Sequence, residues 1–301
     1  MAIVYEHITG NKIKTALLLG AFLVLISVLG FVFSRAYGAL EILYAAVAFS
    51  VIYALVSYYF SANITLSLSG AKLVDRAANP YLYNLVENLA ITAGLPTPKI
   101  YIIEDTAMNA FATGRNPENA VVVFTTGILQ RLNRTEIEGV VAHELSHIGN
   151  YDIRLMTMVV ILVGVLTLLA DFFLRVGLRV RFGRSRNGGQ AQLLFMALGI
   201  VLAILSPVIA TLIQLAISRK REYLADASGT LLTRYPEGLA SALEKISGDT
   251  EPLEAANKAT AHLYIANPLK NHHDSIGWFA GLFNTHPPAA ERIRRLRSMG
   301  G

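Results

Sequence analysis

The sequence of 301 residues contains no cysteine. Disulfide frameworks, zinc sites built on thiolates, thiol nucleophiles and iron–sulfur clusters are therefore excluded. Any metal ion must be bound by histidine, aspartate or glutamate side chains. The candidate metal ligands are therefore the 7 histidines and 21 acidic residues of the chain.

Charged residues are also scarce, at 16% of the sequence, whereas an ordinary soluble domain has about 25%. Hydrophobic residues make up 53%, and the mean hydropathy is +0.47. These values exclude intrinsic disorder and disfavour an ordinary cytosolic globule. The net charge is +5, but the basic residues gather beside apolar runs and lack the interleaved aromatic residues of a nucleic-acid-binding surface. We therefore expect the lipid bilayer, and no nucleic acid, as a partner.

Nearly uncharged residues are concentrated in four runs, at residues 15–34, 42–71, 155–174 and 187–218. Each run is long enough to cross a bilayer as a helix, which takes roughly 20 residues, although Asp171 interrupts the third and Pro207 the fourth. The first run exceeds the roughly 7 to 15 apolar residues of a cleaved signal peptide, which favours a retained anchor. The sequence predicts a mainly α integral membrane protein with about four transmembrane helices in two hairpins.

The segment between the two hairpins has the composition of a soluble domain. Residues 99–104, 109–113 and 120–125 favour β-strands and are separated by turn residues, which predicts a small β-meander. Residues 134–150 follow, with apolar side chains at the three- and four-residue spacing of an amphipathic helix.

This predicted helix contains the sequence His143-Glu144-Leu145-Ser146-His147, which has the form H-E-x-x-H. Residues four apart share one face of a helix, so both imidazoles can bind one zinc ion while the glutamate lies beside them. The alternative is a pair of solvated histidines without a metal. A catalytic zinc site has three protein ligands, so the hypothesis requires another donor elsewhere in the chain.

A third histidine ligand of the metzincin type is excluded, because Ile153 stands at the position that would require it. A carboxylate from a separate helix fits better. Glu222 and Asp226 form an E-x-x-x-D pattern after the second hairpin, so Glu222 can bind the metal while Asp226, one turn later, accepts a hydrogen bond from the outer nitrogen of a ligand histidine.

Taken in order, these motifs and the apolar hairpins resemble the HtpX-like membrane zinc metallopeptidases, which are related to the Ste-type CAAX prenyl proteases. The likeness covers nearly the whole chain and includes residues 109–114, the H-E-x-x-H helix, residues 221–226, Thr285-His286-Pro287-Pro288 and Glu291-Arg292-Ile293. It implies a zincin-type α+β catalytic domain with a small β-sheet. We expect four units: a transmembrane hairpin (1–71), a first catalytic segment (72–154), a second transmembrane hairpin (155–218) and a second catalytic segment (219–301).

The residues permit metal-assisted peptide hydrolysis. Zinc lowers the pKa of a bound water to about 7, and Glu144 takes the water proton and passes it to the departing amine. The resemblance points to His286 and Arg292 as stabilisers of the oxyanion. The alternatives are that His286 only precedes a helix and that Arg292 belongs to a solvated or lipid-facing basic cluster.

The resemblance also identifies Asn109, Ala110, Phe111 and Ala112 as part of an edge strand. An exposed edge binds an extended polypeptide through backbone hydrogen bonds, with little demand on its sequence. The alternative is an ordinary buried strand, since three of these four side chains are apolar.

The leading hypothesis is a zinc endopeptidase that cleaves membrane or misfolded proteins in membrane protein quality control. The alternatives are a CAAX-type prenyl protease, which would have more spans, a metal-binding scaffold, which would not need Glu144, and a zinc transporter, whose ligands would lie within the spans. The resemblance implies the inner membrane of a prokaryote and a cytoplasmic catalytic domain. The basic residues give only a weak bias on orientation, and an arginine-rich hairpin tip at residues 175–186 opposes it.

Overall fold

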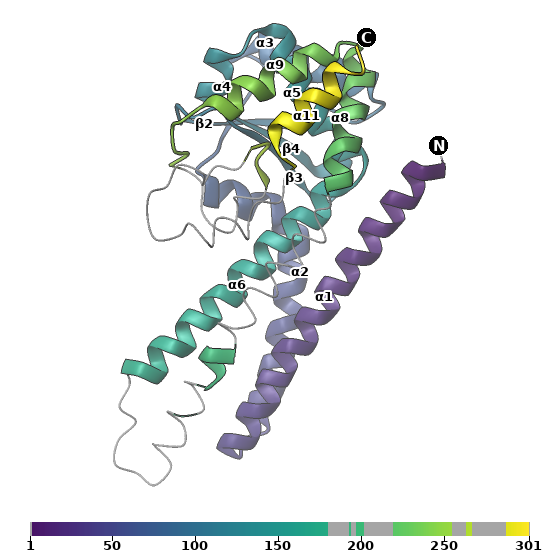
Figure 1. The fold of residues 1–301 in the computed structure, drawn as a ribbon. Helices are drawn as coiled ribbons and strands as arrows, with labels where there is room; N and C mark the ends of the chain where they lie inside the picture. Colours follow the sequence, from purple (N-terminus) through teal and green to yellow (C-terminus); the bar gives the residue numbers. More distant parts are fainter. Residues whose placement is uncertain are drawn as a thin grey trace.

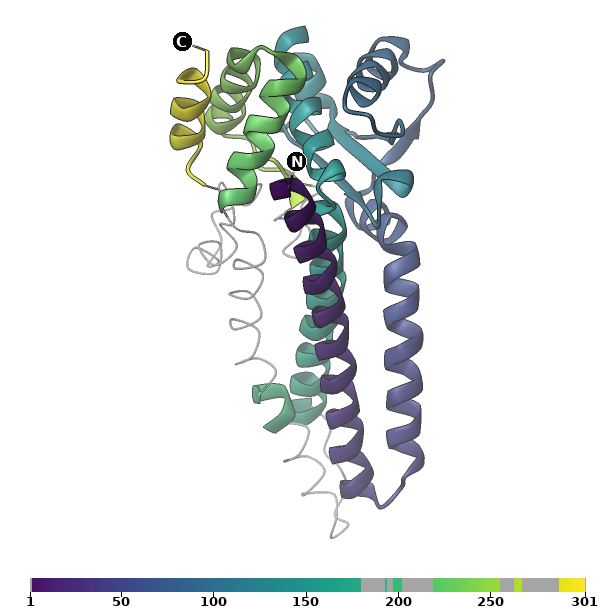
Figure 2. The same cartoon turned by 90° about the vertical axis from the view of Figure 1, so that its right-hand side faces the viewer.

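Two long apolar helices begin the chain in the computed structural model, which describes residues 2–179, 193, 197–201, 219–254, 263–266 and 287–300. Helices α1 (Ala2–Tyr37) and α2 (Glu41–Ser69) form a hairpin (Figure 1 and Figure 2). The turn between them uses Gly38, whose φ of 67° lies in the left-handed region that favours glycine. Gly30 lets the two helices approach closely, because a Cβ atom there would lie 2.4 Å from the Cβ atom of Ala46.

Within the described residues, two helical stretches have the length and composition of membrane spans, Ile8–Arg35 and Glu41–Ser69. The 28 residues of the first extend about 42 Å, more than the roughly 30 Å of a hydrocarbon core. Only 17% of the first apolar window and 11% of the second is buried, whereas the core helix of a soluble protein is mostly buried. The first two predicted spans are therefore helices suited to a membrane.

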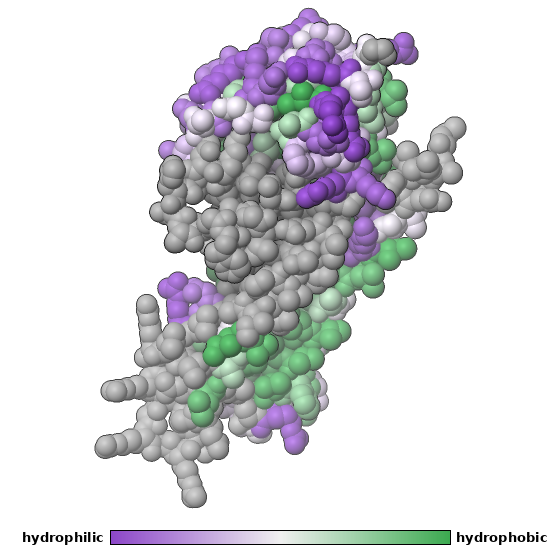
Figure 3. All heavy atoms as spheres, viewed as in Figure 1, coloured by the Kyte–Doolittle hydropathy of each residue, from purple (hydrophilic) through white to green (hydrophobic). Residues whose placement is uncertain are grey.

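A third long helix, α6 (Asp152–Arg179), runs beside this hairpin (Figure 2). Phe22 and Ile26 of α1 pack against Leu162 of α6, and farther along the rings of Phe33 and Phe173 stack with centroids 5.5 Å apart. We call α1, α2 and α6 the stalk, and Figure 3 shows hydrophobic side chains gathered on it.

The third predicted segment, 155–174, is thus helical, and the fourth, 187–218, lies mostly outside the described residues. Asp171, which interrupts the third apolar run, lies in the second half of α6. Its side chain is 51% exposed, and Arg175, one turn later, pairs with it at 2.7 Å.

A four-stranded sheet follows the first hairpin, with strand order β1-β2-β4-β3. Strands β1 (Lys72–Val74) and β2 (Lys99–Ile103) are antiparallel, β2 and β4 (Ala120–Thr125) are parallel, and β4 is antiparallel to β3 (Ala110–Gly114). The predicted β-meander is therefore wrong, because β3 lies beyond β4 at the edge and β2 pairs with β4. The continuous run of buried residues in β4 suits a central strand with both faces covered.

Alternate residues of β4 contact two different layers, as the two-residue period of a strand requires. Val122 and Phe124 pack toward α5 (Arg134–Gly149). Val121 and Val123 pack in a second cluster with Leu66 of α2 and with Met156 and Val159 of α6. The sheet is therefore sandwiched between α5 and the ends of the stalk helices.

In the described part of the chain, five more helices surround α5 and the sheet: α3 (Pro80–Thr92), α4 (Thr126–Arg131), α8 (Arg219–Thr233), α9 (Pro236–Gly248) and α11 (Ala289–Arg297). We call β1–β4 together with α3, α4, α5, α8, α9 and α11 the head. It combines elements that precede and follow the second predicted hairpin, and Figure 1 shows α8, α9 and α11 beside α5.

Candidate active site

Helix α5 carries the H-E-x-x-H residues and begins at a capping box. Asn133 accepts a hydrogen bond from the backbone N–H of Glu136 at 3.0 Å, and the Glu136 carboxylate accepts one from the N–H of Asn133 at 2.8 Å. The helix is buried along most of its length, and all five motif residues are buried. The alternative of two solvated histidines is therefore wrong.

His143 and His147 meet Glu222 of α8, and one ligand atom from each lies within 4.8 Å of the others. The two Nε2 atoms are 3.2 Å apart, and Glu222 oxygens lie 3.8 Å from His143 Nε2 and 3.5 Å from His147 Nε2. Ligands of a tetrahedral zinc at about 2.0–2.1 Å lie about 3.4 Å from one another, so these residues fit zinc. Gly229 permits this approach of α8, because a Cβ atom there would lie 3.0 Å from the backbone nitrogen of His143.

The Nδ1 atom of each histidine, on the side of the ring away from the proposed metal, contacts a buried carboxylate. Asp226 Oδ1 lies 3.0 Å from His143 Nδ1, the type of contact the sequence predicted, and Asp152 Oδ2 lies 2.9 Å from His147 Nδ1. Because each carboxylate occupies the Nδ1 side of its ring, both Nε2 atoms face Glu222 and are left to bind a metal. Sequence reasoning missed Asp152, although its place five residues after His147, just beyond the helix end, was a usable signal.

Tyr151 makes the turn that brings Asp152 back to the histidine. Its φ of 58° is left-handed, which costs a non-glycine residue about 1–2 kcal/mol. α5 ends at Gly149 and α6 begins at Asp152, so the strained residue lies in the two-residue connection between these helices. The guanidinium of Arg154 also makes cation–π contacts with the rings of Tyr151 and Tyr58, with Cζ 5.3 and 5.5 Å from their centroids.

Glu144 is buried beside the three ligands and accepts a hydrogen bond from the backbone of Ala112 in β3. Burial, with a smaller contribution from the charge of Glu222, raises the pKa of Glu144 to about 7. A carboxyl group with a pKa near neutrality can both accept and release a proton at physiological pH.

Arg292 is buried in the site, so its assignment to a solvated surface is wrong. It donates two hydrogen bonds to Asp226, Nε to Oδ2 at 2.9 Å and Nη2 to Oδ1 at 2.7 Å, and a third from Nη1 to the carbonyl oxygen of Ile265 at 3.2 Å. Its neighbours Arg294, Arg295 and Arg297 are exposed and pair with glutamates of α11 and α9. The surface interpretation holds for those three.

The predicted substrate strand lies at the edge of the sheet, but its edge is not free. All five residues of β3 are buried, and the carbonyl oxygen of Ala110 accepts a hydrogen bond from the backbone of Ile265 at 2.9 Å. The Asn109 amide donates to the carbonyl oxygen of Ala266 at 3.1 Å. The expectation of an exposed edge is therefore wrong at this end of the strand, because residues 263–266 cover it. His286 lies outside the described residues.

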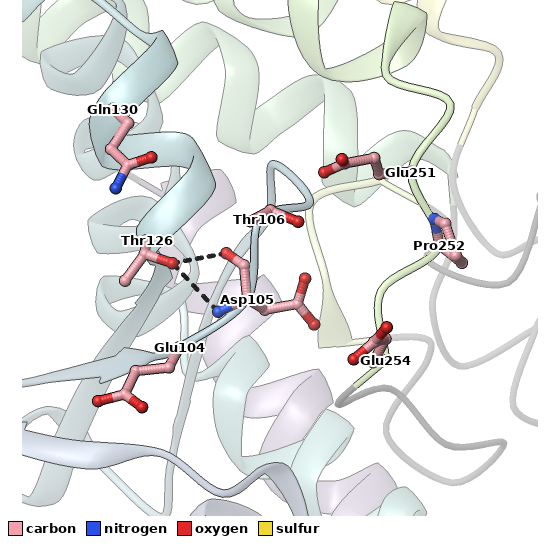
Figure 4. Close-up of a pocket in the computed structure, with 8 residues that line it drawn as sticks. All are labelled: Glu104, Asp105, Thr106, Thr126, Gln130, Glu251, Pro252 and Glu254. Atoms are coloured by element: carbon pink, nitrogen blue, oxygen red, sulfur yellow. Dashed lines mark hydrogen bonds between the residues drawn. The ribbon is translucent and has the colours of Figure 1, made fainter.

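An open acidic cavity of about 450 Å³ lies elsewhere on the head, where β2 ends and α4 begins (Figure 4). Its carboxylates are Glu104, Asp105, Glu251 and Glu254. The Thr126 hydroxyl donates to the carbonyl oxygen of Asp105 at 2.8 Å and so fixes one wall. None of the residues that line this cavity belongs to the predicted site, so the cavity is separate from the zinc-ligand cluster.

The two histidines differ in protonation in the metal-free protein. Burial lowers the pKa of His143 to about 4. Burial opposes protonation of His147 as well, but its hydrogen bond with Asp152 and the charge of Glu222 raise the pKa of His147 to about 9. At pH 7.5 His143 is neutral and His147 is protonated, although a zinc ligand must be neutral.

Zinc binding is therefore expected to release about one proton from His147 at pH 7.5, and the apparent affinity should fall about tenfold per pH unit as the pH drops from 9 to 7. Calorimetry in two buffers with different ionisation enthalpies measures this release. Asp152→Asn should lower the pKa of His147 and reduce the release. Heats that do not depend on the buffer would contradict the prediction.

Comparison with known proteins agrees with this geometry. The sequence pattern of peptidase family M48 matches residues 76–300. The protease HtpX homolog of Tropheryma whipplei (strain TW08/27) is 45% identical, covering 98% of each chain. The protease HtpX homolog of Dictyoglomus turgidum is 47% identical, covering 98% of this chain and 95% of its own. Among solved structures, S. mikatae Ste24p has a similar fold, with a TM-score of 0.52 and 18% identity over 98% of this chain and 67% of that chain.

These likenesses extend over both the head and the stalk. The chain is a membrane zinc metalloendopeptidase of the HtpX type, and the enzyme hypothesis is confirmed over the scaffold and the transporter. Its relatives come from bacteria, in keeping with a bacterial membrane protein that acts on polypeptides. The chain belongs to peptidase family M48.

Proposed function

We propose that His143, His147 and Glu222 bind one zinc ion and that Glu144 is the general base of peptide hydrolysis. The convergence of three buried donors from two helices, with the glutamate beside them, carries the proposal. A zinc ion held by these residues would lower the pKa of a water to about 7 and polarise the scissile carbonyl.

Glu144 takes a proton from the attacking water and delivers it to the departing amine. Its pKa of about 7 in the metal-free protein keeps both protonation states accessible near neutral pH. The hydrogen bond from the backbone of Ala112 fixes the carboxylate next to the edge strand, which favours attack on a carbonyl held there. Polypeptide substrates, including membrane and misfolded proteins, are thus proposed to meet β3 at Ala112, past the Asn109–Ala110 end that residues 263–266 cover.

Arg292 and Asp226 are proposed to orient His143. Three of the five N–H donors of the Arg292 guanidinium bond to Asp226 and Ile265. Contact with an oxyanion would therefore use one of the two remaining N–H groups or replace one of these bonds. Its buried positive charge nevertheless favours negative charge that develops nearby. His286, six residues earlier and directly before the buried Pro287, stays a candidate for the second oxyanion donor.

Removal of the metal tests this function. Detergent-purified protein is expected to cleave casein, to lose at least about 100-fold in rate with a zinc chelator, and to recover when zinc is added, because zinc contributes several kcal/mol of transition-state stabilisation. Product peptides are quantified over time. Undiminished cleavage after complete metal removal, verified by elemental analysis, would rule out the zinc mechanism.

We further propose four membrane crossings, so that residues 72–154 and 219–301 form one catalytic domain facing the cytoplasm of a prokaryote. Helix α6 begins directly after α5 of the head, and α8 lies in the head as well. The stacked rings of Phe33 and Phe173 place the other part of α6 beside the far end of α1. This arrangement supports a fourth crossing between α6 and α8. Basic residues near the head end of the stalk support a cytoplasmic head: Lys12, Lys14, Lys72, Arg76 and Arg154.

Single cysteines provide a clean test of the four crossings, because the natural chain has none. Ser185→Cys and Ala39→Cys are expected to react with an impermeant maleimide from one side of the membrane. Glu104→Cys, at an exposed position directly after β2, should react only from the other side. Labelling of Ser185→Cys together with Glu104→Cys would contradict the second transmembrane hairpin.

A further inference from the structure

The zinc-ligand cluster is connected to α1 through one buried polar side chain. Asn11 lies in α1, is only 3% exposed, and donates from Nδ2 to Asp152 Oδ1 at 2.7 Å and to the carbonyl oxygen of Asn150 at 3.0 Å. Asp152 in turn holds His147 Nδ1 at 2.9 Å through its other oxygen. A continuous chain of hydrogen bonds therefore runs from the first stalk helix to a zinc ligand.

The oxygen of the same amide contacts the other ligand helix. Arg221 Nη1 donates to Asn11 Oδ1 at 3.2 Å, and Arg221 Nε lies 3.2 Å from Asp152 Oδ1. Arg221 directly precedes the ligand Glu222 at the start of α8. Asn11 thus donates to Asn150 and Asp152, just after the end of α5, and accepts a hydrogen bond from α8. Helices α5 and α8 supply all three proposed zinc ligands.

We propose that Asn11 is a positioning residue for the zinc site: it fixes the Asp152 carboxylate, and through it the His147 ring, in the orientation that presents Nε2 to the metal. This inference rests on the proposed assignment of His147 as a zinc ligand. A carboxylate beside a ligand histidine orients the ring, and loss of such a partner costs 10–100-fold in metal affinity or activity. Asn11 acts one step farther out and ties that orientation to the membrane helix.

A purely structural role is the competing explanation, in which Asn11 only attaches α1 to the head. The two roles differ in what they change. A structural anchor lowers the stability of metal-free and zinc-bound protein alike, whereas a positioning residue weakens zinc binding. The affinity for zinc therefore separates them independently of catalysis.

The test measures the zinc Kd of the full-length, metal-free protein in detergent by competition with a chromophoric chelator, at several pH values, and corrects each Kd for proton competition at His147. Asn11→Leu is expected to raise Kd about tenfold. Thr15→Val is the matched control, because Thr15 is buried one turn later in α1 and its hydroxyl bonds only the helix backbone at Asn11 among the contacts described. Its Kd should change less than about twofold. If the leucine variant does not fold, Asn11→Ser is used instead, and its Kd is expected to rise in the same way.

A double-mutant cycle tests the route through Asp152. Asp152→Asn alone should raise Kd about 10–100-fold, and Asn11→Leu added to it should change Kd by less than about twofold, because the connection is already broken. Independent effects would instead multiply. Multiplicative effects, or an unchanged Kd in Asn11→Leu with a lowered melting temperature of the metal-free protein, would overturn the proposal.

His147→Ala separates this inference from the function on which it rests. If His147→Ala leaves the zinc Kd unchanged, the proposed ligand set itself fails. If His147→Ala abolishes stoichiometric zinc binding while Asn11→Leu binds zinc normally, the ligand set stands and only the positioning role of Asn11 is wrong.

Discussion

Glu144→Gln is expected to reduce kcat for casein by at least about 100-fold while the protein keeps one equivalent of zinc, because a positioned general base contributes roughly 10²–10⁴-fold. The amide has nearly the same shape as the carboxyl group but cannot accept a proton from water. Its oxygen can still accept the hydrogen bond from the backbone of Ala112. Rate and zinc content are measured on the same preparation.

Glu138→Gln is the matched control, since Glu138 lies on the same helix but outside the site, where it pairs with Arg134 at 2.9 Å. It should retain the activity of the unaltered protein. Full proteolysis by Glu144→Gln would show that Glu144 is not the general base. Loss of zinc from that variant would show that the glutamate maintains the metal site instead.

Arg292→Met is expected to lower the free energy of unfolding by about 3–5 kcal/mol, the usual cost of leaving one partner of a buried ion pair alone. Asp226 would lose both hydrogen bonds from the guanidinium while remaining buried between α8 and α11. In the unaltered protein, burial raises the pKa of Asp226. The charge of Arg292, the hydrogen bond from His143 and those from Arg292 outweigh this effect and lower the pKa to about 2. Denaturant unfolding of the metal-free protein in detergent measures the loss.

Two further variants interpret that result. Arg294→Met removes an exposed arginine of the same helix and should cost less than about 1 kcal/mol, as surface ion pairs do. Adding Asp226→Asn to Arg292→Met removes the unpaired charge and should recover part of the stability. A double variant less stable than Arg292→Met would show that the buried charge of Asp226 is not the origin of the loss.

Local patterns predicted the features of this protein that depend on local spacing. Four-residue spacing on a helix was enough to bring His143 and His147 to one face of α5, and long apolar runs were enough to identify α1 and α2. The same spacing held an unused signal for Arg292. It lies four residues before the buried Leu296, so it shares the inward face of α11, whereas a cluster of arginines taken together suggested a surface.

Long-range pairings could not be read in the same way. The alternation of β-favouring residues identified the runs that form β2, β3 and β4, but strand order depends on which strand has both faces covered. The uninterrupted apolar sequence of β4 was the available clue to its central position. The contact between Asn11 and Asp152 joins residues 141 positions apart and leaves no periodic trace in either segment.

The packing of the sheet on the stalk determines where this peptidase can be active. Leu66 of α2 and Met156 of α6 belong to the same cluster as Val121 and Val123, so the helices that hold the chain in lipid also complete the core beneath the catalytic residues. A head without the stalk helices would expose that apolar face and be destabilised. Separation of the head from the stalk is therefore expected to end hydrolysis instead of releasing a diffusible enzyme.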